Sequence, residues 1–200
     1  MDLFSFEQYK SILPYDGKTI YYGVVLNSNE VNFYYNSLLE TINWKNDELK
    51  IFGKSIITKR KVSWYGDKEF LYTYSGITKK ANIWTEELLS LKSKVEKLSK
   101  ETYNSCLLNL YHSGDEGMAY HSDDEKMLKK NGAIASLSIG AKRKFSLKHK
   151  KNKQRIDIIL ESGSLLVMKG ETQQHWLHTL PKTKKNISPR INLTFRTINI

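Results

Sequence analysis

The chain has 200 residues, enough for one domain with a sizeable core, and its 40% hydrophobic and 12% aromatic content excludes a disordered protein. Its 32 Lys and Arg against 21 Asp and Glu give a net charge of +11, which favours a polyphosphate partner, with solubility as the alternative explanation. The single cysteine, Cys106, excludes a disulfide framework and a cysteine-bound zinc site.

The sequence carries few targeting features. Its first residues lack the basic and then apolar order of a signal peptide, and no apolar run approaches membrane-spanning length. We therefore expect a soluble intracellular protein with no membrane partner, and nucleus and cytoplasm are not separated. A monomer is the default expectation for the oligomeric state.

Outside residues 47–80, one strand and two helices are expected in the first hundred residues. Residues 20–26 are rich in aromatic and β-branched side chains, which predicts a strand. Between residues 30 and 44 the apolar side chains recur at helical spacing, with Ser28 or Asn29 as the expected N-cap. Residues 84–98 repeat the helical pattern with a charged outer face.

Residues 47–80, between the two helices, combine short strand-like runs with many aromatic residues and interleaved cations. Residues 51–54 predict the tip of a hairpin, and residues 71–75 predict a strand with Tyr72 and Tyr74 on one face. Aromatic rings stack on bases and cations meet phosphates, so the segment suits a nucleic-acid surface. The equally open alternative is that these tyrosines belong to the core.

The second half of the chain has the pattern of an all-β domain, in which glycines separate short apolar runs. The predicted strands are residues 106–111, 134–139, 144–148, 155–160, 164–168 and 191–197. This number of short strands indicates a sandwich or jelly roll. The expected fold class is mainly β with flanking helices (α+β).

The last predicted strand has two unlike faces at the two-residue period of a strand. Its apolar face consists of Ile191, Leu193 and Phe195. Its polar face consists of Arg190, Asn192, Thr194 and Arg196. Buried arginines need anionic partners, so a polar face turned into the protein predicts a pocket for a small dianion.

Metal-ligating residue types occur at a spacing that suits iron. His121 and Asp123 project to one side of an extended segment because they are two residues apart. A histidine from a distant strand, His178, completes a two-histidine, one-carboxylate set, which non-haem Fe(II) oxygenases use with open coordination positions. His175 competes with His178 for the third position.

Six motifs occur in the order of one known family. They are Asn109-x-Tyr111, His121-x-Asp123-Asp124-Glu125, and residues 134–141, 163–166, 175–181 and 189–196. Together they resemble the AlkB family of Fe(II)- and 2-oxoglutarate-dependent dioxygenases over about residues 50–197. They are most similar to the animal AlkB homologue that repairs double-stranded DNA.

The resemblance implies a double-stranded β-helix (jelly roll) core at residues 101–200. Residues 1–100 would supply N-terminal helices and a nucleotide-recognition lid with a hairpin, within one compact domain. The first thirty residues match nothing in the family.

The resemblance also implies the iron and cosubstrate ligands. Its Trp-x-His-x-Leu-Pro pattern selects His178 over His175, so the implied Fe(II) ligands are His121, Asp123 and His178. His112 and His149 match no ligand position and are expected at the surface. The residues implied for 2-oxoglutarate are Arg190, Asn192 and Tyr111 at its distal carboxylate, Arg196 and Asn109 near the iron-chelating end, and Thr194 on the same face. A salt-bridged strand without a ligand is the alternative.

For substrate recognition, the resemblance implies that an extruded base stacks between Tyr74 and His121. Tyr72, Asp124 and Glu125 would contact the base edge. The acidic pair suits a cationic methylated base, which pairs poorly and is extruded at lower cost. Support of the metal site is the alternative role for this acidic pair.

Two further residues are implied to act on duplex DNA. Phe52 would fill the gap that the extruded base leaves, as apolar wedges do in other DNA complexes. Arg60 would reach the opposite strand. Clustered lysines would bind phosphates without sequence preference.

The implied activity is oxidative demethylation of N-alkylated bases, such as 1-methyladenine and 3-methylcytosine, in DNA. Fe(II), 2-oxoglutarate and O2 would be required, and formaldehyde, succinate and CO2 released. Three alternatives stay open. They are the same chemistry on RNA or single-stranded DNA, a dioxygenase of a protein or small molecule, and a nucleic-acid-binding protein without catalysis.

Overall fold

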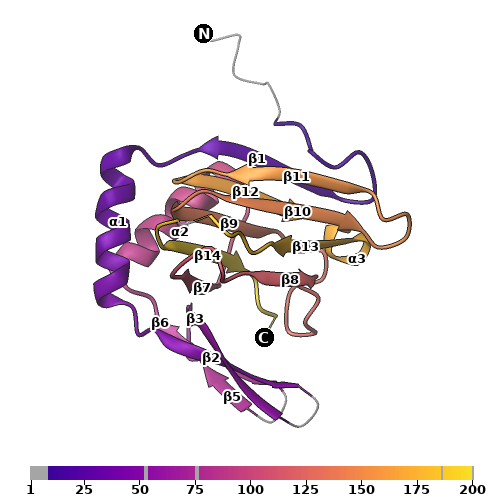
Figure 1. Ribbon diagram of the computed structural model, residues 1–200. Helices are drawn as coiled ribbons and strands as arrows, with labels where there is room; N and C mark the ends of the chain where they lie inside the picture. Colours follow the sequence, from indigo (N-terminus) through magenta and orange to yellow (C-terminus); the bar gives the residue numbers. More distant parts are fainter. Residues whose placement is uncertain (1–8, 52–53, 75–76, 186, 200) are drawn as a thin grey trace.

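The computed structural model describes residues 9–51, 54–74, 77–185 and 187–199, with the backbone alone for residues 49–51, 54–56, 72–74, 77 and 78. Two sheets face each other (Figure 1). The larger sheet has the order β1-β12-β9-β14-β7-β3-β2, with β6 beside β3, and the smaller has the order β11-β10-β13-β8. A separate ribbon, β4-β5, stands below the larger sheet.

The larger sheet is antiparallel except where β3 and β6 pair. Its strands are β1 (Lys18–Val24), β2 (Lys45–Ile51), β3 (Lys54–Gly66), β6 (Asn82–Ile83), β7 (Ser105–Tyr111), β9 (Ile134–Gly140), β12 (Ser164–Lys169) and β14 (Arg190–Arg196). The smaller sheet contains β8 (Met118–His121), β10 (Arg143–His149), β11 (Arg155–Leu160) and β13 (Trp176–Leu180). The ribbon contains β4 (Leu71–Tyr74) and β5 (Ile77–Lys80). Two facing antiparallel sheets confirm the expected mainly β, jelly-roll fold.

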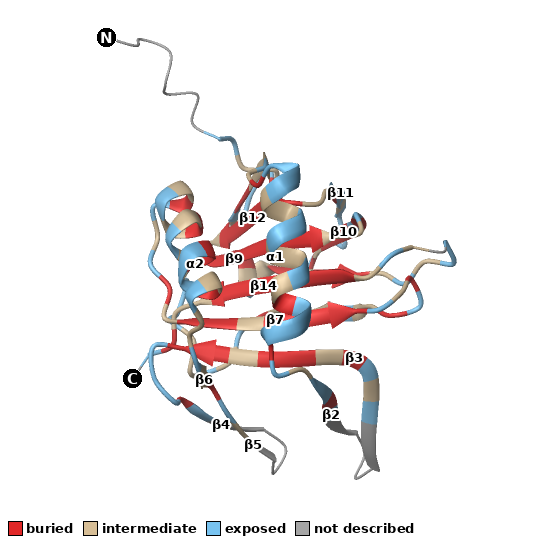
Figure 2. Cartoon of the chain, turned by 90° about the vertical axis from the view of Figure 1, so that its left-hand side faces the viewer, coloured by how far each residue is buried: buried red, intermediate tan, exposed pale blue. Residues whose placement is uncertain are grey.

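Three helices flank the sheets: α1 (Ser28–Thr41), α2 (Glu86–Ser99) and α3 (Thr172–His175). Helices α1 and α2 cover the outer face of the larger sheet, in front of β9, β14 and β7 (Figure 2). Their buried side chains, such as Leu38 and Leu91, pack with Leu108, Leu137 and Leu193. The apolar face of β14 is therefore turned toward the helices, and its polar face is turned toward the smaller sheet.

The helix ends follow capping chemistry. The N-cap of α1 is Asn27, not Ser28 or Asn29, because Asn27 and Glu30 form a reciprocal capping box. The N-cap of α2 is Thr85, whose side chain accepts from the amide of Leu88. No described helix is long and apolar enough to cross a membrane.

The two halves of the sequence share the larger sheet, since β1 pairs with β12 and β3 pairs with β7. Strands β2 and β3 form the expected hairpin, with Ile51 opposite Lys54. Its tip, which includes Phe52, lies outside the described residues. The sequence patterns did not predict β8 and β13, the two strands that lead to the candidate metal ligands.

Gly140 offers a test of how tightly the end of β9 is packed. Its φ is +93°, and a Cβ atom there would lie 2.5 Å from the carbonyl oxygen of Pro189. Gly140→Ala is expected to lower the free energy of unfolding by about 2–4 kcal/mol, through left-handed strain and a backbone clash. Gly170→Ala, at φ +63° in open space, should lose only about 1–2 kcal/mol. Equal losses in denaturant unfolding would contradict the packing argument.

Candidate metal centre and anion pocket

His121, Asp123 and His178 meet between the two sheets. His121 ends β8 and is paired directly with His178 on β13, which brings their ring centroids to 4.2 Å. Asp123 follows two residues later, and one ligand atom from each of the three lies within 4.8 Å of the others. The Nδ1 of His121 is 2.9 Å from the carbonyl oxygen of Ala119, so Nε2 is the nitrogen left for a metal.

The charge states of the three residues suit a divalent cation. Burial lowers the pKa of His178 to about 4, so its imidazole is neutral at physiological pH. Burial opposes ionisation of Asp123, but Arg196 and the two histidines outweigh it, and the pKa of this carboxyl lies below its ordinary value. A neutral imidazole and a carboxylate are the protonation states in which these groups bind metals.

Arg190 at the start of β14 is the buried cation of the anion pocket. It is 2% exposed, and its Nη2 donates to Ser138 Oγ (2.9 Å) and Asn192 Oδ1 (2.7 Å). Among the described residues no carboxylate forms an ion pair with it, and its Nε atom is buried without a partner. Burial accordingly lowers the pKa of Arg190 to about 10. Such a cation requires an anionic partner, and the described part of the chain supplies none.

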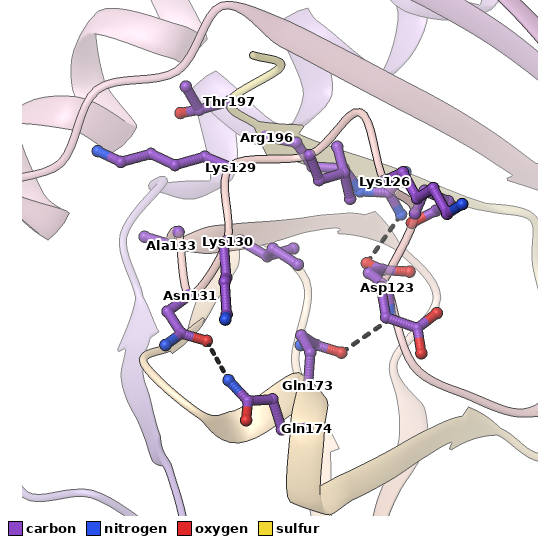
Figure 3. A pocket seen from close by; sticks show the side chains of 15 residues that line it. Asp123, Lys126, Lys129, Lys130, Asn131, Ala133, Gln173, Gln174, Arg196 and Thr197 are labelled. Carbon is purple, nitrogen blue, oxygen red and sulfur yellow. Dashed lines mark hydrogen bonds and ion pairs between the residues drawn. The ribbon is translucent and has the colours of Figure 1, made fainter.

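Arg196, at the other end of β14, binds the candidate metal ligand. Its Nη2 donates to Asp123 Oδ2 at 2.8 Å, as the dashed line in Figure 3 shows. Its Nε and the Oδ1 of Asn109 are also buried without partners. Buried polar atoms normally have hydrogen-bond partners, so these atoms can bind a polar ligand that lies between Arg190 and the three metal-ligating residues.

One pocket joins the two groups. Its lining includes the three candidate metal ligands and all six residues expected at 2-oxoglutarate: Asn109, Tyr111, Arg190, Asn192, Thr194 and Arg196. Hydrogen bonds hold the polar face in place, from Ser136 Oγ to Asn192 Oδ1 and from Asn192 Nδ2 to Thr194 Oγ1, both 2.9 Å. The donor set fits Fe(II), and the unpaired cation fits a carboxylate.

The sequence analysis missed two serines of this site: Ser136, which lines the pocket, and Ser138, which accepts a hydrogen bond from Arg190. They lie on β9 opposite Thr194 and Asn192 of β14. The signal was present, because serines alternate with apolar residues along this buried strand.

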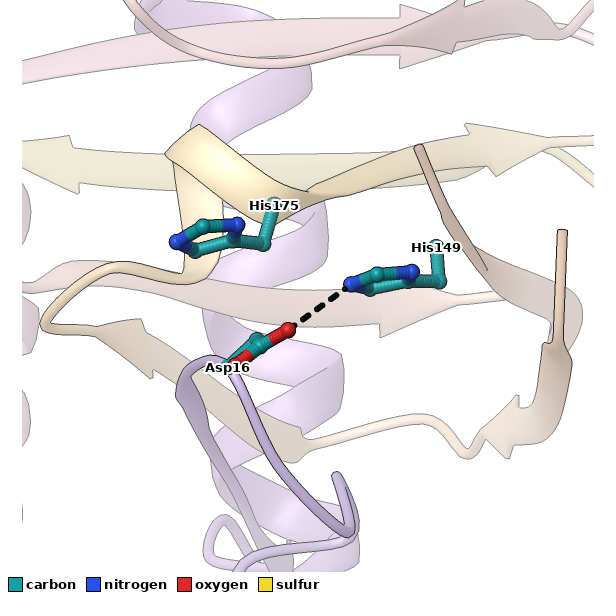
Figure 4. Close-up of side chains that lie close together, drawn as sticks. All are labelled: Asp16, His149 and His175. Carbon is teal, nitrogen blue, oxygen red and sulfur yellow. Dashed lines mark hydrogen bonds and ion pairs between the residues drawn. The ribbon is translucent and has the colours of Figure 1, made fainter. Parts of the chain in front are cut away.

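His175 lies in a separate cluster with Asp16 and His149 (Figure 4). The expectation that His149 is a surface residue is wrong: it is 4% exposed and packs on Trp176 with ring centroids 5.0 Å apart. Its Nδ1 accepts from the amide of Asn152 (3.2 Å), so its Nε2 carries the proton and donates to Asp16 Oδ2 (3.1 Å). Both ring nitrogens are occupied, which makes the cluster an anchor for the segment before β1.

A second pocket of about 420 Å³ opens beside the metal centre. It is lined by His121, Asp124 and Glu125 together with Trp64 and Met118. The structure thus brings the two acidic residues to the same mouth as the metal-ligating histidine. Tyr72 and Tyr74 belong to β4, but their side chains lie outside the described part of the chain.

Arg60 has a different environment from the one expected of a DNA contact. It is 7% exposed and forms an ion pair with Asp47, which also accepts from Lys79 Nζ at 2.6 Å. Its Nη1 is 3.4 Å from Met118 Sδ. The guanidinium therefore braces β2 and β5 against the metal-site mouth and is not presented to a DNA strand.

Comparison with known proteins agrees with this geometry. A family model described as the 2OG-Fe(II) oxygenase superfamily matches residues 18–196. The DNA oxidative demethylase ALKBH2 of Homo sapiens is 38% identical over 158 residues, covering 75% of this chain and 60% of that protein. The alpha-ketoglutarate-dependent dioxygenase alkB homolog 3 of Homo sapiens is 42% identical over 149 residues, covering 70% and 51%.

This chain thus spans between half and two thirds of the length of these curated relatives. The solved structure of OsALKBH1 has the same fold, with a TM-score of 0.60 at 16% identity over 90% of this chain and 97% of that one. The protein belongs to the 2OG-Fe(II) oxygenase superfamily and, within it, to the AlkB family.

Proposed function

We propose that this protein removes N-linked methyl groups from DNA bases by oxidative demethylation. The observation that carries the proposal is the pocket that joins the three metal-ligating residues to Arg190, a buried cation with no carboxylate partner in the described part of the chain. Relatives named DNA oxidative demethylase and the net charge of +11 support a nucleic-acid substrate. The protein would act as a monomer.

The pocket residues have distinct roles in this proposal. His121, Asp123 and His178 hold Fe(II), and Arg190 pairs with the distal carboxylate of 2-oxoglutarate, aided by Asn192 and Tyr111. Arg196 and Asn109 would lie near the iron-chelating end of 2-oxoglutarate, and Thr194 lines the same pocket. When bound, the iron and 2-oxoglutarate supply the oxidation of the methyl carbon by O2, with succinate and CO2 as coproducts. The hydroxymethyl adduct then loses formaldehyde and leaves the repaired base.

The wider pocket would receive the extruded base. His121 forms one wall, and Tyr74 would stack on the opposite face of the ring. Asp124 and Glu125 place negative charge beside it, which favours a cationic base such as 1-methyladenine or 3-methylcytosine. Tyr72 would contribute a hydroxyl at the base edge.

The direct test is release of formaldehyde and succinate from a duplex oligonucleotide with one 1-methyladenine, in the presence of Fe(II) and 2-oxoglutarate. Release from the duplex supports the proposal. Release only from single strands or RNA would retain the chemistry and change the substrate. If 2-oxoglutarate is consumed but no nucleic acid yields formaldehyde, the substrate is a protein or a small molecule. If no 2-oxoglutarate is consumed, the protein is a nucleic-acid-binding protein without catalysis.

Phe52 carries the proposed preference for duplex DNA. Phe52→Ala is expected to slow demethylation of a duplex substrate about tenfold, because the extruded base is no longer replaced by an apolar wedge. The rate on the matching single strand should not change. Ile57→Ala, which removes an exposed apolar side chain from the same hairpin, serves as the control. Equal losses on duplex and single strand would contradict the role.

A further inference from the structure

Lys150, directly after β10, connects the segments that carry the metal ligands. Its half-buried Nζ donates to Ser122 Oγ (3.1 Å) and to the main-chain oxygen of Gln173 (2.8 Å). Ser122 lies between His121 and Asp123, and Gln173 lies on α3, just before the strand of His178. One ammonium group therefore ties together two segments far apart in the sequence.

The hydroxyl of Ser122 links Lys150 to Asp124 through two hydrogen bonds. A hydroxyl has a single proton, and Lys150 donates to its oxygen, so that proton is available for Asp124 Oδ2 at 3.2 Å. Among the described residues, no Lys, Arg or His side chain forms an ion pair with the Asp124 carboxylate. The orientation of Asp124 at the mouth of the base pocket thus depends on Ser122 and, behind it, on Lys150.

Gln173 fixes the neighbouring residue from the other side. Its Oε1 accepts from the amide of Asp123 at 2.9 Å, which Figure 3 shows. The helix that carries it is anchored through Thr172, 1% exposed, whose Oγ1 accepts from the amide of Lys18. The backbone at Asp123 is therefore held by a side chain whose own helix is anchored.

We infer that Lys150 is a positioning residue that sets base selectivity. It touches neither metal nor substrate; through Ser122 it holds the Asp124 carboxylate toward the pocket, where this group favours a cationic methylated base over a neutral one. A carboxylate already oriented in the free protein loses less conformational entropy when the base enters, so the selectivity rests on preorganisation. The inference rests on the proposed function.

The role of Lys150 is tested by measuring DNA binding under conditions that allow no turnover. The protein is loaded with Mn(II) and 2-oxoglutarate, and its affinity is measured by anisotropy for two oligonucleotides that differ in one base. One carries 1-methyladenine, a cation, and the other carries 1-methylguanine, which is neutral. Lys150→Met and Ser122→Ala are each expected to lower the ratio of the two affinities about three- to tenfold, the range that loss of one orienting hydrogen bond produces.

A double-mutant cycle distinguishes an effect of Lys150 that acts through Ser122 from independent effects of these two residues. If Lys150 acts through Ser122, the double variant should lower the ratio no further than either single variant. Lys151→Met removes the same charge from the next position, which is exposed, and should leave the ratio at the wild-type value whatever it does to phosphate binding. Ser122→Ala removes only one oxygen atom, so it measures the contribution of the hydrogen bonds that link Lys150, Ser122 and Asp124 even if Lys150→Met folds poorly.

Several outcomes would overturn the inference. A salt-dependent and equal loss of both affinities in Lys150→Met would make this lysine a phosphate contact. Additive effects of the two substitutions would show that Lys150 and Ser122 act separately. An unchanged ratio in Lys150→Met would defeat the inference alone, whereas a wild type that does not prefer either methylated oligonucleotide over unmodified DNA would defeat the proposed function with it.

Discussion

Arg190→Met is expected to raise the KM for 2-oxoglutarate more than a hundredfold. A buried charge pair that loses one partner typically costs about 3–5 kcal/mol, and about 1.4 kcal/mol corresponds to a factor of ten. Among the described residues, the hydrogen-bond acceptors of the guanidinium are the neutral oxygens of Ser138 and Asn192, and its central carbon lies 5.6 Å from the ring centroid of Tyr111. Most of its interaction free energy is therefore left for the incoming carboxylate. The rate of succinate release against 2-oxoglutarate concentration measures the effect.

The stability of the same variant separates ligand binding from a structural role. Arg190 is a buried cation with no carboxylate partner among the residues that the structure describes. Its replacement by an apolar side chain of similar length should therefore leave the melting temperature of the ligand-free protein unchanged or raise it. The rise in melting temperature that 2-oxoglutarate produces in the wild type should disappear. Arg155→Met, on the exposed start of β11, is the charge-matched control. A lower melting temperature with an unchanged KM would make Arg190 a structural residue.

Parts of the site could be predicted from sequence because they lie on a long, regular strand. In β14 the two-residue alternation separates Ile191, Leu193 and Phe195 from the polar face, and the structure buries both faces between layers. The bounds of β8 and β13 were not predicted, although His121 was expected on an extended segment and His178 on a strand. Both strands are short, and each includes a histidine among its apolar side chains, so neither has the regular alternation that revealed β14.

Other features depend on contacts that no local pattern contains. His149 is buried because two residues from elsewhere in the chain contact its ring: Asp16, which precedes β1, and Trp176, on the neighbouring strand β13. Arg60 is withdrawn from solvent because Asp47 on the neighbouring strand pairs with it. In the sequence, Lys150 is one of several cations in a lysine-rich turn. Its hydrogen bonds to Ser122 and Gln173 in the structure distinguish it from them. Residue type predicted a polar side chain in these three cases, and tertiary contacts decided its role.

His178→Ala is expected to abolish metal binding and demethylation, whereas His175→Ala should leave both close to wild type. The two histidines are three residues apart, yet β13 turns only His178 toward His121 and Asp123. Loss of a group that merely orients a ligand costs about 10- to 100-fold in metal affinity or activity, so loss of a ligand should cost more than a hundredfold. Titration with Co(II), followed by its visible absorption, measures metal binding without turnover.

The pair of variants also separates the two histidine clusters. His175 packs against His149 with nearly parallel rings at 6.3 Å, and its loss should act on stability and not on the metal centre. We therefore expect a lower melting temperature for His175→Ala with unchanged Co(II) stoichiometry. For His178→Ala we expect the Co(II) stoichiometry itself to fall, because this substitution removes one of the three metal-ligating side chains. Loss of one Co(II) equivalent in His175→Ala with full retention in His178→Ala would move the metal centre to the Asp16 cluster and refute the assignment.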